Sequence, residues 1–236
     1  MSYLSPTTPI QYVAEIKHVK EVTLYGVANL EFWQNCLKPE NLIPFQEDGK
    51  AHLFISATEL VYMGIKFREV SFSVYVADPK EVSKHGGFYL IHAFNSSRLF
   101  AFSERTMFQT PYYHGTIQVK ASIPSEFKLM DASDVALKAK MSGVVPCSKS
   151  ENELWEGPIF LPKYISKGNS SGGVFYAKLG GLTETYPFSP SMDTLEFKPT
   201  QNADVIRWLV ESKFMVKEWR VRQDAEHAKS KTYRRD

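Results

Sequence analysis

The sequence predicts an α+β domain that is mostly antiparallel β, either a barrel or a double sheet, with two or three helices. The first observation is the aromatic content of 14%, which is typical of pleated strands. The second is a period-2 alternation over residues 67–77. One face carries Val70, Phe72, Val74 and Val76, and the other carries Glu69, Ser71, Ser73 and Tyr75. The third is the number of short apolar runs, which are separated by loops rich in Gly, Pro and Ser. These runs do not alternate with helical patterns as they would in β-α units.

The size and charge of the chain predict one globular domain over residues 1–236. Its 236 residues are enough for a sizeable core, and 43% are hydrophobic and 23% charged, as in ordinary globular proteins. The net charge is +2, with 28 basic residues interspersed among 26 acidic ones. Because nucleic-acid surfaces need clustered Lys and Arg, we expect no nucleic-acid partner.

The sequence carries no targeting signal that we recognise. A basic segment followed by an apolar run is missing at the N-terminus, and no stretch of about 18 apolar residues occurs, so neither a signal peptide nor a membrane partner is expected. Cys36 and Cys147 are expected to be free, buried thiols, with a disulfide between them as the alternative. The predicted location is the cytoplasm.

The N-terminal half divides clearly into elements. Residues 12–23 are rich in Val and Ile and are predicted to be extended. Asn29 can cap a short helix with Leu30, Trp33 and Leu37 at helical spacing, and Pro39 ends it. Further strands are predicted at 52–57 and 88–94. Residues 95–97 offer caps for a helix that runs to about Phe108, since Pro111 prevents its continuation.

The C-terminal half is predicted to contain further short strands and one more helix. The strands are predicted at 112–121, 127–130, 135–141, 159–160, 174–179 and 194–197, and the last helix near Ala203. From about Lys213 the chain is charged and mostly polar. We expect a helical tail there that frays after Ala228, with contacts in a homo-oligomer as its alternative role.

Several common catalytic motifs are missing. The sequence has no phosphate-binding G-x-x-x-x-G-K-[ST], no G-x-G-x-x-G, no H-E-x-x-H and no G-x-S-x-G. The six histidines form no metal-ligand spacing on one element. We therefore expect neither a cofactor nor a metal.

Glu69 is the first candidate for chemistry. It interrupts a strongly apolar strand region, where a carboxylate must be solvated, paired or protonated. If its face lines a cavity, desolvation would raise its pKa and make it a general acid or base. If its face is the solvent side of a sheet, it is an ordinary surface residue.

A second candidate group follows the helix at 97–108. Arg105 lies a few residues before Thr110, Tyr112 and His114. A guanidinium binds a carboxylate through two parallel hydrogen bonds, so this group could hold a small carboxylate or carbonyl ligand. The alternative is an arginine that is solvated or ion-paired on the helix surface.

The order of these segments resembles the acetoacetate decarboxylase-like superfamily over residues 20–141. The resemblance is carried by Phe67-Arg68-Glu69-Val70, Gly87-Phe88-Tyr89-Leu90, the helical stretch 103–108 and Pro111-Tyr112-Tyr113. It implies a cone-shaped, largely antiparallel barrel around a small-molecule cavity. It also implies that Glu69 matches the family's glutamate in that cavity.

The chain departs from the decarboxylases at the lysine that condenses with the substrate ketone. Thr110 and Pro111 stand where that family carries a Lys-Lys pair, and neither can form a Schiff base. Lys120, Lys138 and Lys140 are candidate substitutes, with solvated strand lysines as the alternative.

Two functional hypotheses follow. The first is an enzyme, of lyase, hydratase or cyclase type, that acts on a small carbonyl or carboxylate compound with Glu69 as acid or base. Arg105 would anchor the carboxylate, while Thr110, Tyr112 and His114 would form a hydrogen-bonding wall. The second is a non-catalytic binding protein that kept the cavity and lost the nucleophile.

Overall fold

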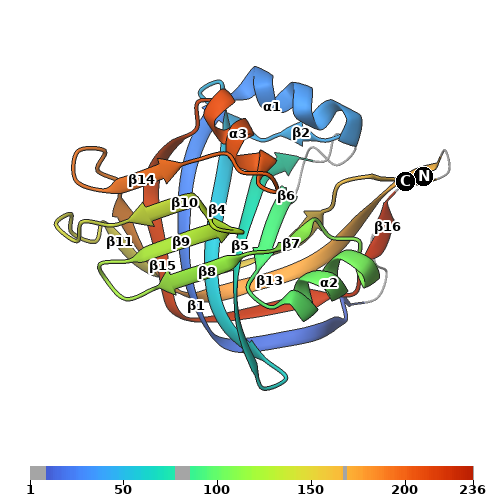
Figure 1. Cartoon of the computed structure of the whole chain (residues 1–236), viewed down its shortest axis with the longest axis horizontal. Helices are drawn as coiled ribbons and strands as arrows, with labels where there is room; N and C mark the ends of the chain where they lie inside the picture. The colour runs from blue at the N-terminus through green and yellow to red at the C-terminus, as the bar shows by residue number, and fades with distance from the viewer. Residues whose placement is uncertain (1–8, 78–85, 167–168, 236) are drawn as a thin grey trace.

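The computed structural model describes residues 9–77, 86–166 and 169–235, and long strands dominate it (Figure 1). Among these residues, seven strands pair in a closed ring. Around the ring, they are β5 (Ile65–Ala77), β4 (Lys50–Tyr62), β1 (Tyr12–Asn29), β15 (Met215–Ser230), β13 (Asn169–Pro187), β11 (Lys149–Phe160) and β6 (Gly87–Asn95). β6 pairs with β11 in parallel and with β5 antiparallel, and the second pairing closes the ring.

Short strands extend the ring at its margins. They are β2 (Ile43–Pro44), β3 (Gln46–Glu47), β7 (Tyr112–His114), β12 (Tyr164–Ser166) and β16 (Tyr233–Arg235). β7 runs parallel to the end of β6 and therefore brings residues 112–114 beside the ring.

A second, smaller sheet packs with two helices against one face of the ring wall. Its strands are β8 (Thr116–Lys120), β9 (Glu126–Asp131), β10 (Asp134–Lys140) and β14 (Thr194–Phe197). The helices α1 (Leu30–Leu37) and α3 (Asp204–Glu211) lie together at the top of Figure 1. The 3-10 helix η1 (Lys38–Glu40) follows α1. The main hydrophobic core fills the space between the ring wall on one side and the smaller sheet and helices on the other. Trp33, Phe72 and Phe127 are fully buried in it.

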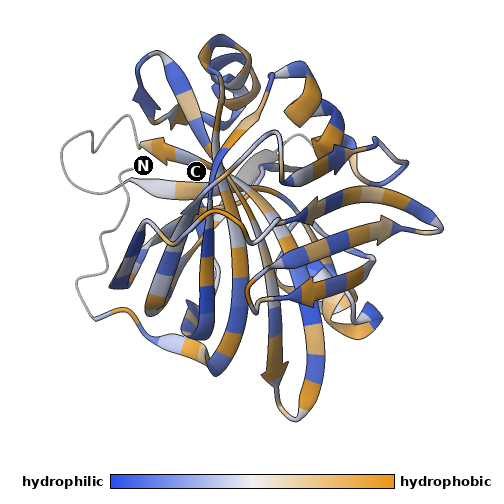
Figure 2. Cartoon of the chain, turned by 90° about the vertical axis from the view of Figure 1, so that its left-hand side faces the viewer, coloured by the Kyte–Doolittle hydropathy of each residue, from blue (hydrophilic) through white to orange (hydrophobic). Residues whose placement is uncertain are grey.

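The ring strands therefore have two different faces. Val70, Phe72 and Val74 of β5 belong to the main core, whereas the alternate residues Glu69, Ser71 and Ser73 line a cavity. Figure 2 shows the same change from hydrophobic to hydrophilic along several strands. The period-2 pattern predicted for residues 67–77 is confirmed, and its polar face looks into a cavity, not into bulk solvent.

The predicted fold class, α+β with mostly antiparallel strands, is confirmed. The predicted cap of the first helix is confirmed as well, because Asn29 Oδ1 accepts a hydrogen bond of 2.8 Å from the backbone N of Phe32. The predicted helix at 97–108 is α2 (Arg98–Met107). The strand predicted at 112–121 is divided into β7 and β8 at Gly115, whose backbone N donates to the carbonyl of Asn95.

The prediction of a helical tail from about residue 213 is wrong. This segment forms β15 and β16, and β15 pairs with β1 on one side and β13 on the other. Trp219 and Val221 are buried in the main core, while Arg220 and Arg222 point to the cavity. Several of the charges that suggested a solvated tail, those of Arg220, Arg222 and Lys229, therefore lie on the inner wall of the ring.

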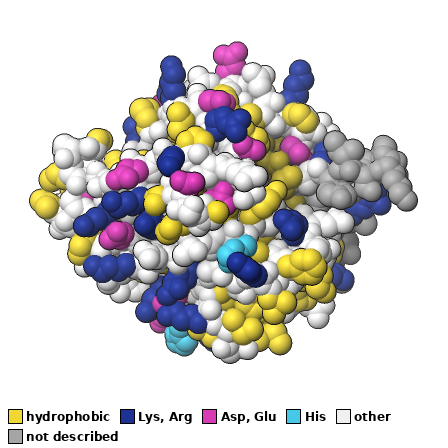
Figure 3. Space-filling view, viewed as in Figure 1, with side chains coloured by type: hydrophobic (Ala, Val, Ile, Leu, Met, Phe, Trp, Pro, Cys, Tyr) yellow, Lys and Arg dark blue, Asp and Glu magenta, His cyan; other side chains and the backbone are white. Residues whose placement is uncertain are grey.

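The face of the molecule seen in Figure 3 carries both signs of charge and an apolar area. In Figure 3, basic and acidic side chains intermix, and hydrophobic side chains gather at the lower right. Leu99, Phe102 and Met107 of α2 are exposed. Within the described residues, no helix has the length and apolar character needed to cross a membrane.

Candidate active site

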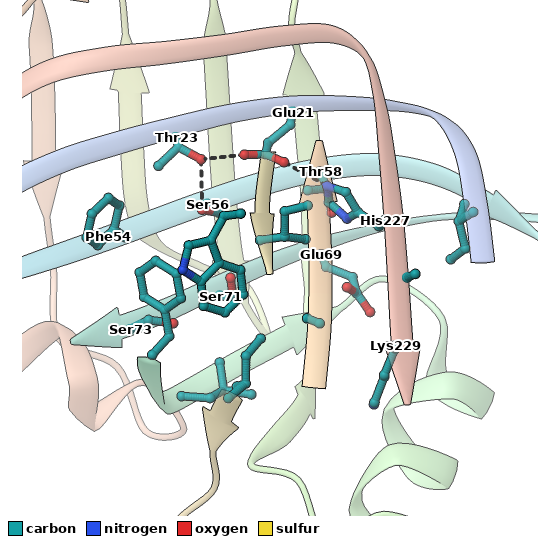
Figure 4. A pocket seen from close by; sticks show the side chains of 18 of the residues that line it. Glu21, Thr23, Phe54, Ser56, Thr58, Glu69, Ser71, Ser73, His227 and Lys229 are labelled. Atoms are coloured by element: carbon teal, nitrogen blue, oxygen red, sulfur yellow. Dashed lines mark hydrogen bonds and ion pairs between the residues drawn. The ribbon is translucent and has the colours of Figure 1, made fainter. Parts of the chain in front are cut away.

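A cavity of about 1220 Å³ lies inside the ring. All seven ring strands contribute to its wall, together with α2 and β7. It reaches the surface where the exposed side chains of Val13, Phe45 and Leu154 form part of its lining. Figure 4 shows polar side chains from several strands converging on it.

Glu69 is held in the cavity wall by its neighbours on adjacent strands. Antiparallel register sets it opposite Thr58 of β4 and Asn95 of β6. The side-chain amide of Asn95, which is fully buried, donates a hydrogen bond of 2.8 Å to Glu69 Oε1. The hydroxyl of Tyr112 donates to Glu69 Oε2 at 3.5 Å. Both carboxyl oxygens therefore have a partner, and the group faces the cavity in a defined orientation.

The environment of Glu69 raises its pKa from 4.5 to about 7. Burial is the main cause, and the nearby negative charge of Glu104 adds to it. The charge of Lys229 and the hydrogen bond from Asn95 act in the opposite direction. A carboxyl whose pKa is near neutrality exchanges protons readily in both directions, which is what a general acid or base requires.

Glu104 and Lys229 form an ion pair in the same cavity. Lys229 Nζ lies 2.8 Å from each carboxylate oxygen of Glu104. The ammonium group also lies over two aromatic rings, 4.9 Å from the centre of Phe108 and 4.7 Å from that of Phe175. The hydroxyl of Thr110 donates to Glu104 Oε2 at 3.0 Å. The pair brings an amine and a second carboxylate close to Glu69.

A second polar cluster occupies the wall formed by β1 and β15. Glu21 Oε2 lies 2.8 Å from His227 Nε2, and Glu21 Oε1 accepts a hydrogen bond from Arg222 at 3.2 Å. Burial raises the pKa of Glu21, but the hydrogen bond from His227 and the charge of Arg222 outweigh it and lower that pKa to about 2. Arg222 also donates to Glu153 at 2.8 Å and to Thr183 at 2.7 Å. Unlike Glu69, Glu21 is a carboxylate at every physiological pH.

The structure brings together part of the predicted site. Glu69 and Tyr112 line the cavity and contact each other, while Thr110 lies behind the wall and touches the cavity only through Glu104. Arg105 and His114 are exposed and do not line the cavity. The guanidinium of Arg105 lies over the ring of Tyr113, at 5.5 Å.

The three lysines suggested as substitute nucleophiles lie elsewhere. Lys120 is on β8 and Lys138 and Lys140 are on β10, all in the smaller sheet and outside the cavity lining. Lys138 pairs with Glu196 at 3.6 Å. In the part of the chain that the structure describes, the lysine that does reach the cavity is Lys229.

Sequence reasoning missed Glu104, Lys229 and the cluster around Glu21. Glu104 stands next to Arg105, and helical spacing alone did not show which of the two faces inward. The alternation of Arg220 and Arg222 with Trp219 and Val221 was a strand signal. It was overlooked because charged residues are usually solvated. Among the described residues, no group of three or more His, Cys, Asp or Glu side chains is arranged to hold a metal ion.

No protein family model and no curated protein sequence matches the chain. Solved structures, in contrast, match it over nearly its whole length. An acetoacetate decarboxylase-like enzyme from Sphingomonas wittichii RW1 aligns with a TM-score of 0.63 and 9% identity, covering 100% of this chain and 98% of that one. The acetoacetate decarboxylase from Legionella pneumophila aligns with a TM-score of 0.68 and 11% identity, covering 99% and 93%.

A third structure is the enduracididine biosynthesis enzyme MppR, complexed with the condensation product of pyruvate and imidazole 4-carboxaldehyde. It aligns with a TM-score of 0.65 and 10% identity, covering 99% of this chain and 96% of that one. These likenesses show that the chain has the fold of the acetoacetate decarboxylase-like proteins, as the order of its segments predicted. At sequence identities of 9–11%, these structural matches are evidence for the fold alone.

Proposed function

We propose that this chain, whose fold is that of the acetoacetate decarboxylase-like proteins, is an enzyme that acts on a small carbonyl or carboxylate compound by acid-base chemistry. The observation that carries this proposal is the state of Glu69, a cavity carboxyl with a pKa of about 7 and with hydrogen-bond partners on both oxygens. Support also comes from MppR, whose bound compound is the condensation product of two carbonyl compounds.

Glu69 is proposed to move a proton to or from the carbon next to the ligand carbonyl. In its ionised form it accepts that proton, and in its protonated form it returns one, so both directions are open near neutral pH. Asn95 and Tyr112 hold the carboxyl in place, because each donates to a different oxygen. This scheme needs no covalent intermediate with the protein.

Lys229 takes over the anchoring role predicted for Arg105. Its ammonium group faces the cavity close to Glu69, whereas Arg105 is exposed on α2. A ligand carboxylate that binds the ammonium group of Lys229 would compete with Glu104, because both carboxylate oxygens of Glu104 lie 2.8 Å from Lys229 Nζ. The ligand would then place its carbonyl carbon beside Glu69.

The test is proton exchange at carbon in deuterium oxide, followed by nuclear magnetic resonance over a panel of 2-oxo and 3-oxo acids and small ketones. Glu69→Gln should abolish exchange and turnover and leave ligand binding largely intact, because the amide keeps the shape but cannot accept the proton. The matched control is Glu47→Gln, which alters a carboxylate at the exposed margin of the same cavity. If the two variants behave alike, Glu69 is not the acid or base.

Borohydride trapping with the same panel tests the covalent alternative. Lys229 is an amine in the cavity, and an amine can condense with a carbonyl and release water to form an imine that borohydride reduces. A stable adduct mapped to Lys229, and lost in Lys229→Arg, would mean that the Schiff-base step occurs from β15. Ligand binding without an adduct would favour acid-base chemistry alone.

A non-catalytic binding protein is the second candidate function. It is favoured by the residues Thr110 and Pro111 where the decarboxylases carry lysines, and by the pairing of Lys229 with Glu104. Tight binding of oxo acids by the wild-type chain, without proton exchange, turnover or a covalent adduct, would identify the chain as a binding protein. A cytoplasmic location, a homo-oligomeric state and the lack of nucleic-acid or membrane partners remain predictions.

A further inference from the structure

The inner wall of the ring is organised in rows that cross neighbouring strands. The first row is acidic and polar, and register aligns its members across β1, β4, β5 and β6 as Glu21, Thr58, Glu69 and Asn95. The second row carries hydroxyl groups, with Thr23 opposite Ser56 and Ser56 opposite Ser71. All of these residues but Asn95 are labelled in Figure 4, and all seven line the cavity.

The next rows are aromatic. Tyr25 of β1 stands opposite Phe54 of β4, and Phe54 stands opposite Ser73. Beyond them, Tyr75 of β5 stands opposite Phe88 of β6. Figure 4 shows Phe54 at the other end of the cavity from Glu69 and Lys229. Along the strands, the wall therefore changes from acidic to hydroxylated to aromatic.

The strand repeat sets the distances between these rows. Residues on one face of a strand are two apart, and each residue adds ~3.3 Å, so successive rows are separated by roughly 7 Å. Glu69 and Ser73 are four residues apart on β5, which puts the row of Tyr25 and Phe54 at ~13 Å from the row of Glu69. The cavity is therefore long, with two chemically different ends.

The aromatic end is a continuous set of ring contacts. The ring centres lie 5.1 Å apart for Tyr25 and Phe54, 5.1 Å for Phe54 and Phe88, and 4.8 Å for Phe88 and Trp155. Tyr75 joins the set at 5.3 Å from Phe88. All five side chains line the cavity, and none is among the fully buried members of the core. They leave apolar ring surface facing a cavity, which is costly unless a ligand covers it.

We infer that the cavity binds an elongated ligand with a flat, neutral aromatic group about 13 Å from the end that meets Glu69. Flat rings fit because aromatic side chains favour edge-to-face and offset contacts with other rings. A neutral ring fits better than a cationic one because the guanidinium of Arg220 already lies over the rings of Tyr25 and Phe54, at 5.1 and 5.9 Å. The hydroxyl row between the ends would face the linker.

The cavity volume supports the same conclusion. At about 1220 Å³ it exceeds the ~300–1000 Å³ that is usual for small-molecule sites. A compound of a few carbon atoms would meet only the acidic row and leave the aromatic end uncovered. The inference rests on the proposed function for the identity of the reacting end, whereas the position of the aromatic group rests on the rows alone.

The experiment compares 3-oxo acids that end in a naphthyl ring with n-alkyl 3-oxo acids of the same length, over a series of linker lengths. Binding is measured by calorimetry. We expect the naphthyl acids to bind about tenfold more tightly than the alkyl acids, with a maximum at the linker that spans the two ends. Equal affinities at every length would overturn the inference.

Variants of the aromatic end make the test specific. Phe54→Leu should remove most of the naphthyl preference, and Phe88→Leu gives a second test if the first variant does not fold. The control Phe102→Leu alters an exposed phenylalanine on α2, outside the cavity, and should leave the preference unchanged. A preference that survives both cavity variants would show that the ring binds elsewhere.

Glu69→Gln separates this inference from the proposed function. The variant should keep the naphthyl preference, since the aromatic rows are unaltered. Wild-type chain that binds naphthyl acids preferentially without any turnover would disprove the catalytic function and leave the ligand class intact. Turnover of short oxo acids with no ring preference would support the catalytic function and disprove the inferred ligand class.

Discussion

The ammonium of Lys229 lies 2.8 Å from both carboxylate oxygens of Glu104, a residue 125 positions earlier in the chain. β15 and α2 thus meet inside the ring through one ion pair, with 24% of the Lys229 side chain and 20% of the Glu104 side chain exposed. Glu69 responds to both charges, since Glu104 raises its pKa and Lys229 lowers it. The protonation of the proposed acid or base therefore depends on a pair that lies beside it.

Lys229→Met should raise the pKa of Glu69 above about 7, because the variant removes the positive charge that lowers it and leaves the charge of Glu104 without its partner. The measurement is the carboxyl infrared band of Glu69 as a function of pH, assigned by subtraction of the Glu69→Gln spectrum. Lys178→Met, an exposed lysine on β13, is the control and should leave the titration unaltered. An unaltered titration in Lys229→Met would mean that the two groups are not coupled.

Glu69→Gln should change how stability depends on pH. The pKa of Glu69 is about 7 in the folded chain, against 4.5 for an unperturbed glutamate. Its stabilising contribution is therefore complete below pH 4.5 and is lost as the pH rises to about 7. The glutamine variant should gain ~3 kcal/mol relative to wild type between these limits, from 1.36 kcal/mol per pKa unit. Urea unfolding at several pH values measures this difference. A difference that stays constant with pH would contradict the raised pKa.

His92 should make the protein sensitive to acid. It is buried against the ring of Tyr113, with centres 4.6 Å apart, and its Nε2 has no hydrogen-bond partner. Burial lowers its pKa from 6.5 to about 4, although the charges of Asp204 and Asp131 act to raise it. Its contribution to stability is present above pH 6.5 and is lost as the pH falls through about 4.

His92→Phe tests this directly, because a phenyl ring can keep the stacking on Tyr113 but cannot take up a proton. Relative to wild type, the variant should gain ~3 kcal/mol in unfolding free energy as the pH falls from 6.5 to 4. The gain has the opposite pH direction to that of Glu69→Gln, so the two variants control for each other. An equal acid sensitivity in His92→Phe and wild type would exclude His92 as the cause.

Arg222→Met should be strongly destabilising. Arg222 is 9% exposed and contacts Glu21, Glu153 and Thr183. Removal of one partner of a buried ion pair costs ~3–5 kcal/mol, because it leaves a buried charge without compensation. Chemical denaturation measures the loss. Arg207→Met is the control, since Arg207 pairs with Asp204 at the surface and such pairs contribute ~0–1 kcal/mol. Similar losses in both variants would contradict the special role of the buried cluster.

Local sequence patterns predicted those features that depend on neighbours along the chain. The alternation in residues 67–77 predicted β5 and both of its faces, because side chains of a strand point to opposite sides in turn. Asn29 and Pro39 predicted the limits of α1, because capping and helix termination act within a few residues. Glu69 was selected for the same kind of reason, as a carboxylate inside an apolar strand.

The C-terminal segment shows why sequence reasoning failed elsewhere. Arg222 and His227 were expected on a solvated tail, since charged residues usually face water. Their partner is Glu21, which is 201 and 206 residues away in the chain. The desolvation cost of burying these charges is offset only because β15 lies beside β1 and brings them to Glu21. No pattern within residues 213–236 indicates that pairing.

By itself, the sequence determined the strand-rich α+β class and the two alternating faces of residues 67–77, with Glu69 on the polar face, because these depend on local periodicity and residue type. The tertiary structure alone decided that Lys229 and Glu104 meet beside Glu69, that Arg105 and His114 stay outside, and that aromatic rows form the far end of the cavity. The physical reason is that ring closure and strand register bring distant residues into contact and bury Glu69 among them, which raises its pKa.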